Sequence, residues 1–320
     1  MGPTLQEIAA AAKVLSGKAI KTPTLALTQA RWGKILPDAE VVVKLELFQQ
    51  TGSFKARGAY LGVDGLDDAG RRAGVVAASG GNHAMAVAWA AKRAGVDALI
   101  AMPKTTDPER VKGCKALGAA VILCEDMPAA FQVMKDESAK GRLMLHPFEG
   151  VHMTLGSGVL GLEYLNQAPD VDVFVVPVGG GGLISGMACA IKQAKPSAKI
   201  IGVEPVGADS MYRSLKAGAA LTLAKIDTIA DSLGAPMAMP YSFAVTAAHV
   251  DKVVHVTDTE MLDAMQHYGD ILRIMSEPAC AASLAAIIGP LREEIKGRNV
   301  GIIACGSNIG LDRYHQLMRT

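Results

Sequence analysis

The chain has 320 residues, half of them apolar, which is enough to bury the core of one large domain or of two ordinary ones. Its 32 basic and 31 acidic residues leave a net charge of +1, and no basic block forms the electrostatic footprint of a nucleic-acid-binding protein. The five cysteines are scattered, without the spacing of a zinc site or a disulfide framework, so a reducing cytoplasm is expected. No stretch reaches the roughly 18 uncharged apolar residues of a membrane span, so a membrane partner is not expected. The absence of a basic block likewise means that a nucleic-acid partner is not expected.

The predicted elements begin with a helix, because Thr4 and Glu7 have the spacing of a capping box. Short β-branched runs predict strands at 41–47, 74–79, 97–102, 119–124, 172–178, 199–203 and 299–305. Segments of helical length lie between them, at 82–94, 107–117, 181–194 and 279–288. This alternation predicts a mainly parallel sheet covered on both faces. Ligands bind beyond the carboxyl ends of such strands, so the residues after each run are candidates for a functional site.

The first of these runs is followed by "ELFQQTGSFKARGAY", which places Lys55 between Phe54 and Ala56. A single lysine is usually a solvated residue on a surface helix. A partly desolvated lysine in a cleft is instead suited to nucleophilic chemistry. The segment by itself does not decide between these interpretations.

The strand at 74–79 is followed by a turn of Ser79, Gly80, Gly81, Asn82 and His83 that opens a long helix. Free amides at a helix N-terminus bind carboxylates, and the amide side chain is able to donate to a phenolic oxygen. The simpler interpretation is a helix cap. The histidine is expected to be packed and hydrogen-bonded rather than a proton-transfer group.

Consecutive glycines, Gly179 to Gly182, follow the strand at 172–178 and lead into a helix. Such a loop points successive N–H groups inward and is suited to binding phosphate, although close strand–helix packing is an equally good explanation. The spacing is neither a dinucleotide fingerprint nor a Walker loop, so a nucleotide is not required. Cys305 ends the last predicted strand, where either a buried structural thiol or a weak partner for a ring nitrogen is expected.

The segments "TGSFKARGA", "SGGNHA", "PVGGGGLISG", "GVEP", "SEPA" and "CGSN" occur in this order along the chain. With them, nearly the whole chain resembles the serine/threonine dehydratase and serine racemase group of pyridoxal-phosphate enzymes. The resemblance implies the α/β, two-domain, three-layer parallel-sheet fold of the tryptophan synthase β-like enzymes. It also implies a large cofactor-binding domain (1–54 and 151–320), a small mobile domain (55–150) and a homodimer.

The resemblance assigns roles to the motif residues. Lys55 is implied to be the catalytic lysine that bonds to pyridoxal 5'-phosphate, with Phe54 against the pyridine ring. Cys305 is implied to face the ring nitrogen, where a neutral partner favours β-elimination. The other assignments are Gly179, Gly180, Gly181, Gly182 and Leu183 for the cofactor phosphate, Asn82 for the ring hydroxyl, and Ser79, Gly80, Gly81, Asn82 and His83 for the substrate carboxylate.

A cation site is implied by "GVEPVGADS", in which Glu204, Ala208 and Ser210 match the spacing of the family's metal ligands. Leu233 and Ala235 match positions that add backbone carbonyls. Relatives with a divalent ion carry an aspartate where Ser210 stands, so a potassium-type ion is expected. The neighbouring Asp209 leaves magnesium or manganese open.

The implied function is an ammonia-lyase that converts a β-hydroxy L-amino acid, threonine or serine, to a 2-oxo acid and ammonia. Racemases of the group carry a serine where Gly80 stands, so elimination is expected to exceed racemisation. Dehydratases for 3-phenylserine or 3-hydroxyaspartate are alternatives, although Phe131 stands near the place of the arginine that would hold a second carboxylate. A β-replacement synthase or a catalytically silent cofactor-binding protein fits the Lys55 context less well. The chain ends soon after "CGSN", so an isoleucine-binding regulatory domain is not expected.

Overall fold

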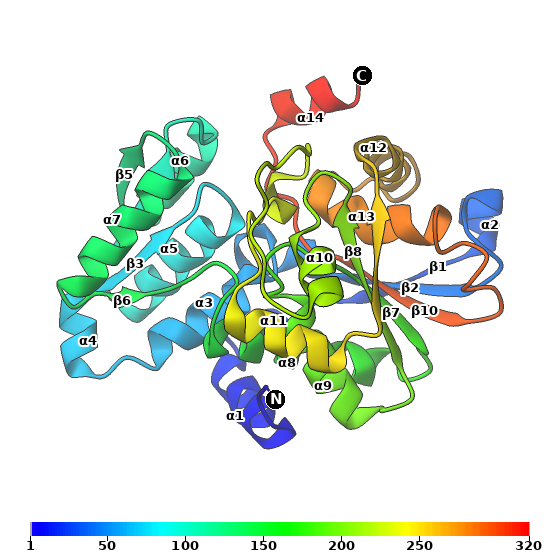
Figure 1. Cartoon of the computed structure of the whole chain (residues 1–320), viewed down its shortest axis with the longest axis horizontal. Coiled ribbons are helices and arrows are strands. Elements are labelled where there is room, and N and C mark those ends of the chain that lie inside the picture. Colours follow the sequence, from blue (N-terminus) through cyan, green and yellow to red (C-terminus); the bar gives the residue numbers. More distant parts are fainter. Residues whose placement is uncertain (1, 320) are drawn as a thin grey trace.

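The β-branched runs form the strands of two sheets in the computed structural model, which describes residues 2–319 (Figure 1). The larger sheet has six strands in the order β1-β2-β10-β7-β8-β9, all parallel except for the antiparallel β1. The smaller sheet has four parallel strands in the order β5-β4-β3-β6. The strands are β1 (Thr24–Leu27), β2 (Glu40–Leu45), β3 (Val75–Ala78), β4 (Ala98–Pro103), β5 (Ala120–Cys124), β6 (Leu143–Met144), β7 (Val173–Pro177), β8 (Lys199–Pro205), β9 (Lys252–Val256) and β10 (Asn299–Ala304).

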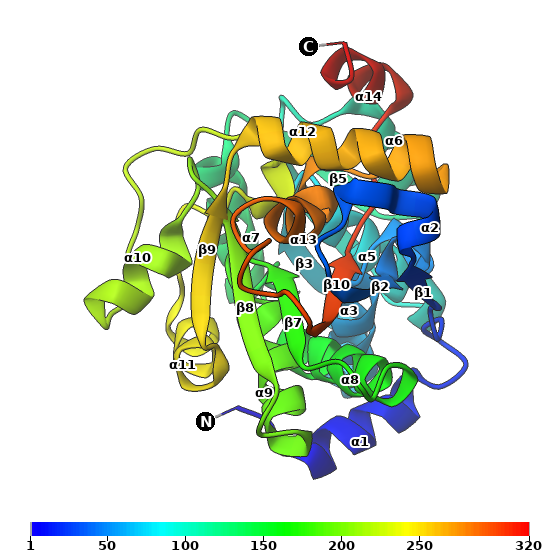
Figure 2. The ribbon, with the colours of Figure 1, turned by 90° about the vertical axis from the view of Figure 1, so that its right-hand side faces the viewer.

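Helices cover both sheets. They are α1 (Leu5–Leu15), α2 (Gln29–Trp32), α3 (Lys55–Asp64), α4 (Asp68–Ala73), α5 (Asn82–Ala94), α6 (Pro108–Ala116), α7 (Met127–Ala139), α8 (Val151–Gln167), α9 (Ile184–Ala194), α10 (Ser210–Ala217), α11 (Pro240–His249), α12 (Asp258–His267), α13 (Pro278–Ile288) and α14 (Leu311–Leu317). Short helical turns are η1 (Gly33–Ile35), η2 (Glu46–Phe48), η3 (Gln50–Gly52), η4 (Asp231–Leu233) and η5 (Tyr268–Leu272). Helices α8 and α9 cover one face of the larger sheet, and α13, backed by α12, covers the other (Figure 2).

The smaller sheet separates two apolar cores, as strand β3 shows. Its residues are all buried, as expected of a parallel strand with both faces covered. Val75 and Ala77 belong to the core that includes α5, whereas Val76 and Ala78 pack with Ala130 on α7. Helix α3 packs against both α5 and α8, and therefore lies between the two sheets.

The predicted strands are all present, as β2, β3, β4, β5, β7, β8 and β10, and the capping box of Thr4 and Glu7 starts α1. The sequence did not predict β1, β6 and β9, which are short or lie at sheet edges. Such strands lack a continuous apolar run because one side faces solvent or a loop. The domain boundaries at 54/55 and 150/151 stay a prediction. None of the helices formed by residues 2–319 combines the length and the apolar composition that a transmembrane segment needs.

Candidate active site

Residues at the carboxyl ends of strands from both sheets line a cavity of about 590 Å³. Ala78 and Pro103 come from β3 and β4, and Pro177 and Cys305 from β7 and β10. The position agrees with the rule that open parallel sheets bind ligands beyond their carboxyl ends. The cavity brings together predicted residues from distant parts of the sequence: Phe54, Lys55, Ser79, Gly80, Gly81, Asn82, His83, Gly179, Gly180, Gly181, Gly182, Leu183 and Cys305.

Lys55 is the first residue of α3 and reaches into this cavity. Its Nζ donates a hydrogen bond to the carbonyl of Pro147 and lies 4.8 Å from the centre of the Phe54 ring. Burial lowers the pKa of Lys55 to about 8, although the nearby Cys305 and Glu277 side chains act in the opposite direction. A large share of its amine is therefore neutral at mildly basic pH, as a nucleophile or base requires.

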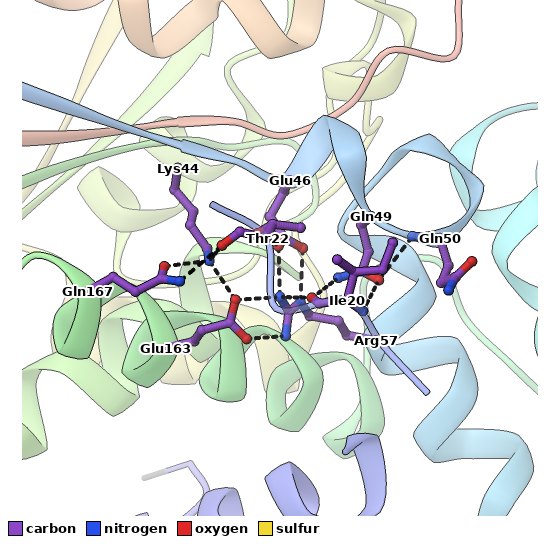
Figure 3. Close-up of polar contacts among 9 residues, drawn as sticks. All are labelled: Ile20, Thr22, Lys44, Glu46, Gln49, Gln50, Arg57, Glu163 and Gln167. Atoms are coloured by element: carbon purple, nitrogen blue, oxygen red, sulfur yellow. Dashed lines mark hydrogen bonds and ion pairs between the residues drawn. The ribbon is translucent and has the colours of Figure 1, made fainter. Parts of the chain in front are cut away.

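A buried network of charges fixes the first turn of α3, two residues beyond Lys55 (Figure 3). Arg57 donates to Glu46 at 2.8 and 2.9 Å and to Glu163 of α8 at 3.0 and 3.1 Å. Lys44 of β2 donates to the same Glu163 at 2.5 Å. The two cations and two carboxylates neutralise each other, and the bidentate contacts limit how far α3 can move. The network therefore fixes the position of Lys55 relative to the larger sheet.

Close packing against Phe148 leaves no room for side chains at Gly180 and Gly182 in the loop at 179–182. A Cβ at Gly180 would lie 2.2 Å from the Phe148 ring, and one at Gly182 would lie 2.8 Å from the Phe148 Cα. Gly181 has a φ of +89°, which favours glycine over other residues. The N–H groups of residues 179–183 make no hydrogen bond within residues 2–319, and the loop lines the cavity. A loop of unpaired donors at the start of α9 is suited to a phosphate.

Asn82 is held by two neighbours in the cavity wall. Its Nδ2 donates to Glu277 at 2.6 Å, and its Oδ1 accepts from Asn308 at 2.6 Å. Burial, together with the charge of Asp231, raises the pKa of Glu277 to about 7. The sequence assigned no chemistry to Glu277. A signal was available, because a glutamate immediately before the largely apolar helix Pro278–Ile288 is placed to be buried with it.

The turn before α5 presents free amides, as the sequence suggested. The Ser79 Oγ accepts from the Gly81 N–H at 3.1 Å, whereas the N–H groups of Asn82 and His83 have no partner among the described residues. The His83 Nε2 bonds to the Leu145 carbonyl at 2.8 Å. Burial lowers the pKa of His83 to about 3, so its ring is neutral. It is a packed, hydrogen-bonded residue, as expected.

Cys305 is buried at the end of β10, and its Sγ lies 3.8 Å from the Ala279 carbonyl. The neighbouring Cys280 thiol and burial raise the pKa of Cys305, so the thiol is protonated and neutral. A neutral thiol is able to make only a weak hydrogen bond.

The start of α6, together with the loop that precedes it, closes the cavity from the side of the smaller sheet, and this role was not predicted. Arg110 donates to Asp231 at 2.9 Å, to the Asn308 carbonyl at 2.6 Å and to the Gly80 carbonyl at 3.3 Å. The cavity wall also includes Thr106, Met127, Phe131, Phe148 and Arg313. The Arg110 contacts join segments that are far apart in the sequence, so no local sequence pattern could predict them.

The expected cation ligands are only partly brought to the cavity. Leu233 and Ala235 line it, whereas Glu204, Ala208 and Ser210 lie outside its wall. Glu204 accepts the N–H groups of residues 211 and 212 at 2.9 and 2.7 Å, and burial raises its pKa to about 8. The Ser210 Oγ is buried and has no hydrogen-bond partner in the described part of the chain. Within residues 2–319, no group of three or more His, Cys, Asp or Glu side chains is arranged to hold a metal.

Comparison with known proteins gives consistent matches. A family model described as pyridoxal-phosphate dependent enzyme matches residues 15–306. The chain is 45% identical over 274 residues to a phenylserine dehydratase of Ralstonia pickettii, covering 85% of this chain and 84% of the relative. It is 36% identical over 317 residues to an L-threonine ammonia-lyase of Thermotoga maritima, covering 98% and 78%. The structure of maize serine racemase superposes with a TM-score of 0.93 at 34% identity, covering 100% of this chain and 98% of that one.

Proposed function

The chain belongs to the pyridoxal-phosphate-dependent enzyme family, and on that premise we propose that it is an ammonia-lyase acting on a β-hydroxy L-amino acid, threonine or serine. The products are a 2-oxo acid and ammonia. The observation that carries the proposal is the Lys55 amine, whose pKa burial lowers to about 8, in a cavity that is also lined by the unpaired N–H groups of residues 179–183.

The cavity residues fit the cofactor that the family implies. The glycine loop has no room for a Cβ at Gly180 or Gly182, and its unpaired donors suit the cofactor phosphate. The neutral Cys305 thiol suits an unprotonated ring nitrogen, and Asn82 is held with an amide donor at the cavity. Phe54 is placed beside the Lys55 amine to contact the ring.

The chain's own residues then have distinct tasks in the reaction. Bound pyridoxal phosphate supplies the electron sink for the electron pair left when the α-proton is removed. The Lys55 amine accepts that proton, and its lowered pKa suits a base near neutral pH. The amides of the turn at 79–83 hold the substrate carboxylate. The β-hydroxyl leaves as water, and a second water later releases ammonia, so the overall change is from amino acid to 2-oxo acid and ammonia.

A second candidate substrate is 3-phenylserine. The cavity wall beyond the cofactor loop includes Met127 and Phe131 of α7, and Phe131 stacks on His146 at 5.5 Å between ring centres. An apolar, aromatic wall suits a phenyl substituent, and the similarity to a phenylserine dehydratase supports the same candidate. Racemase activity is less favoured, because Gly80 presents no hydroxyl.

Release of 2-oxo acid from serine, threonine, 3-phenylserine and 3-hydroxyaspartate separates these candidates. We expect threonine or serine to have the highest kcat/KM. A preference for 3-phenylserine would move the assignment to the second candidate. Turnover of none of the four, in protein shown to carry the cofactor, would contradict the ammonia-lyase proposal.

Lys55→Ala tests the catalytic residue. It is expected to lower lyase turnover by about 10⁴-fold or more, since both the cofactor bond and the base are lost. Borohydride reduction followed by peptide mapping should find the cofactor on the 55-containing peptide of the wild type alone. A reducible linkage on the same peptide in the variant would disprove the assignment.

We also propose that Glu204, Ala208, Ser210, Leu233 and Ala235 hold a monovalent cation, and that the protein is a cytoplasmic homodimer. The buried, unpartnered Ser210 hydroxyl supports the cation, and the five free, buried cysteines support a reducing compartment. Activity should depend on potassium over sodium and survive chelation. Loss on chelation, restored by magnesium or manganese, would show a divalent site instead.

A further inference from the structure

Thr106 occupies the space above Gly80 in the cavity wall. It lies in the loop between β4 and α6, where its N–H donates to the Pro103 carbonyl at 3.0 Å and closes a turn. A Cβ built on Gly80 would lie 2.5 Å from the Thr106 Oγ1. The threonine side chain therefore stands where a side chain at residue 80 would stand, and both residues line the cavity that contains Lys55.

The Thr106 hydroxyl has no hydrogen-bond partner among the described residues, although the residue is only partly exposed. Helix α6, which follows this loop, also fixes Gly80, because Arg110 in its first turn donates to the Gly80 carbonyl at 3.3 Å. The loop and the first turn of α6 thus cover the turn at 79–81 with the Thr106 hydroxyl, which is free to bind a ligand, and with the Arg110 guanidinium, which is already engaged.

We propose that Thr106 is a further substrate-binding residue, whose hydroxyl donates a hydrogen bond to the substrate carboxylate beside the N–H groups of Asn82 and His83. This rests on the proposed function, since it takes an amino acid as the ligand. The neighbouring polar groups are less available: Arg110 is paired with Asp231 at 2.9 Å, and the His83 Nε2 is bonded to a carbonyl at 2.8 Å.

The test uses Thr106→Val, which keeps the shape and removes the hydroxyl, with Thr106→Ser as the matched control that keeps it. Binding of L-alanine to the holoenzyme is followed by the change in the cofactor's absorption spectrum. L-alanine has the carboxylate but no β-hydroxyl, so its affinity reports on the carboxylate without turnover. KM and kcat for L-serine are measured in parallel.

In Thr106→Val, the Kd of L-alanine and the KM of L-serine should rise together by about 10- to 100-fold, as expected when a hydrogen bond to a charged group is lost. Thr106→Ser should stay close to the wild type. Unchanged L-alanine binding in Thr106→Val would overturn the proposal, and so would an effect on L-serine alone, which would place Thr106 on the β-hydroxyl.

Thr106→Ala serves as a second variant if the valine form does not fold, with the same expected outcome. The experiment also distinguishes failure of the proposed function from failure of the Thr106 proposal. A wild type that binds L-alanine but releases no 2-oxo acid would contradict the lyase proposal, while the alanine affinities would still report on Thr106.

Discussion

At the scale of single residues, Lys55 owes its reactivity to its surroundings. Its pKa of about 8 comes mainly from burial, and the neutral amine becomes abundant as the pH rises through this value. In cofactor-free protein, the rate of covalent cofactor uptake should therefore increase from about pH 7 to pH 9 and then level off. Surface lysines titrate near 10.4 and react later. Uptake that begins to rise only above pH 10 would show that Lys55 is solvated.

Gly80 and Thr106 form a second residue-scale pair whose members depend on each other. Gly80→Ser alone should destabilise the protein by about 1–3 kcal/mol, because its Cβ would lie 2.5 Å from the Thr106 Oγ1. Adding Thr106→Ala should restore stability and place a hydroxyl on residue 80. We then expect more D-serine relative to pyruvate, and chiral chromatography with thermal unfolding measures both effects.

Thr106→Ala alone is the control for this pair. The changes in stability should be non-additive, as for residues in contact. Additive effects on unfolding, or a double variant that forms no more D-serine than the wild type, would contradict this interpretation.

Site residues within contiguous motifs were accessible to sequence reasoning, whereas those that act across the cavity were not. The segments around Lys55, Asn82 and Gly179 each follow a strand, so a local pattern could place them at the same edge. Glu277 and Arg110 gain their roles from partners far along the chain, such as Asn82 and Asp231. A single sequence contains no record of such contacts.

At the scale of elements, the attachment of α3 depends on the buried charges of Figure 3. Arg57 overcomes the effect of burial and lowers the pKa of Glu46, so this carboxylate is ionised. Glu46→Gln should lower the free energy of unfolding by about 3–5 kcal/mol, because it leaves the two buried cations, Arg57 and Lys44, with Glu163 as their one remaining carboxylate. Denaturant-induced unfolding measures this.

The matched control is Glu293→Gln, which removes one partner of an exposed ion pair with Lys296 and should change little. Equal midpoints for Glu46→Gln and the wild type would show that the network does not stabilise the fold. No local sequence pattern predicts this network. Lys44 reads as one polar residue within a strand, and only the approach of α8 supplies its partner Glu163.

At the scale of the whole molecule, Arg110 joins the part of the chain that carries the smaller sheet to η4 and to the loop around Asn308. Arg110→Met should weaken the attachment of the smaller sheet to η4 and to the loop around Asn308, while leaving the apolar cores of the two sheets intact. Amide hydrogen exchange should become faster at 79–83 and 231–234 and stay unchanged in β3 and β7, and the KM of the substrate should rise.

Lys112→Met is the control for Arg110→Met, since Lys112 lies on the same helix with its side chain 77% exposed. Exchange that is unchanged in Arg110→Met, or that rises equally in both variants, would argue against a closing role for Arg110.

The position of β10 within the larger sheet has a consequence for biosynthesis. β10 pairs with β2 on one side and β7 on the other, yet it is the last of the described strands to leave the ribosome. Until residues 299–304 emerge, β2 and β7 keep unpaired edges, which are a known hazard for aggregation. Pairing between residues some 260 positions apart is also slow. We therefore expect these two edges to need protection until residues 299–304 have emerged, and Cys305 joins Lys55 at the cavity only after that point.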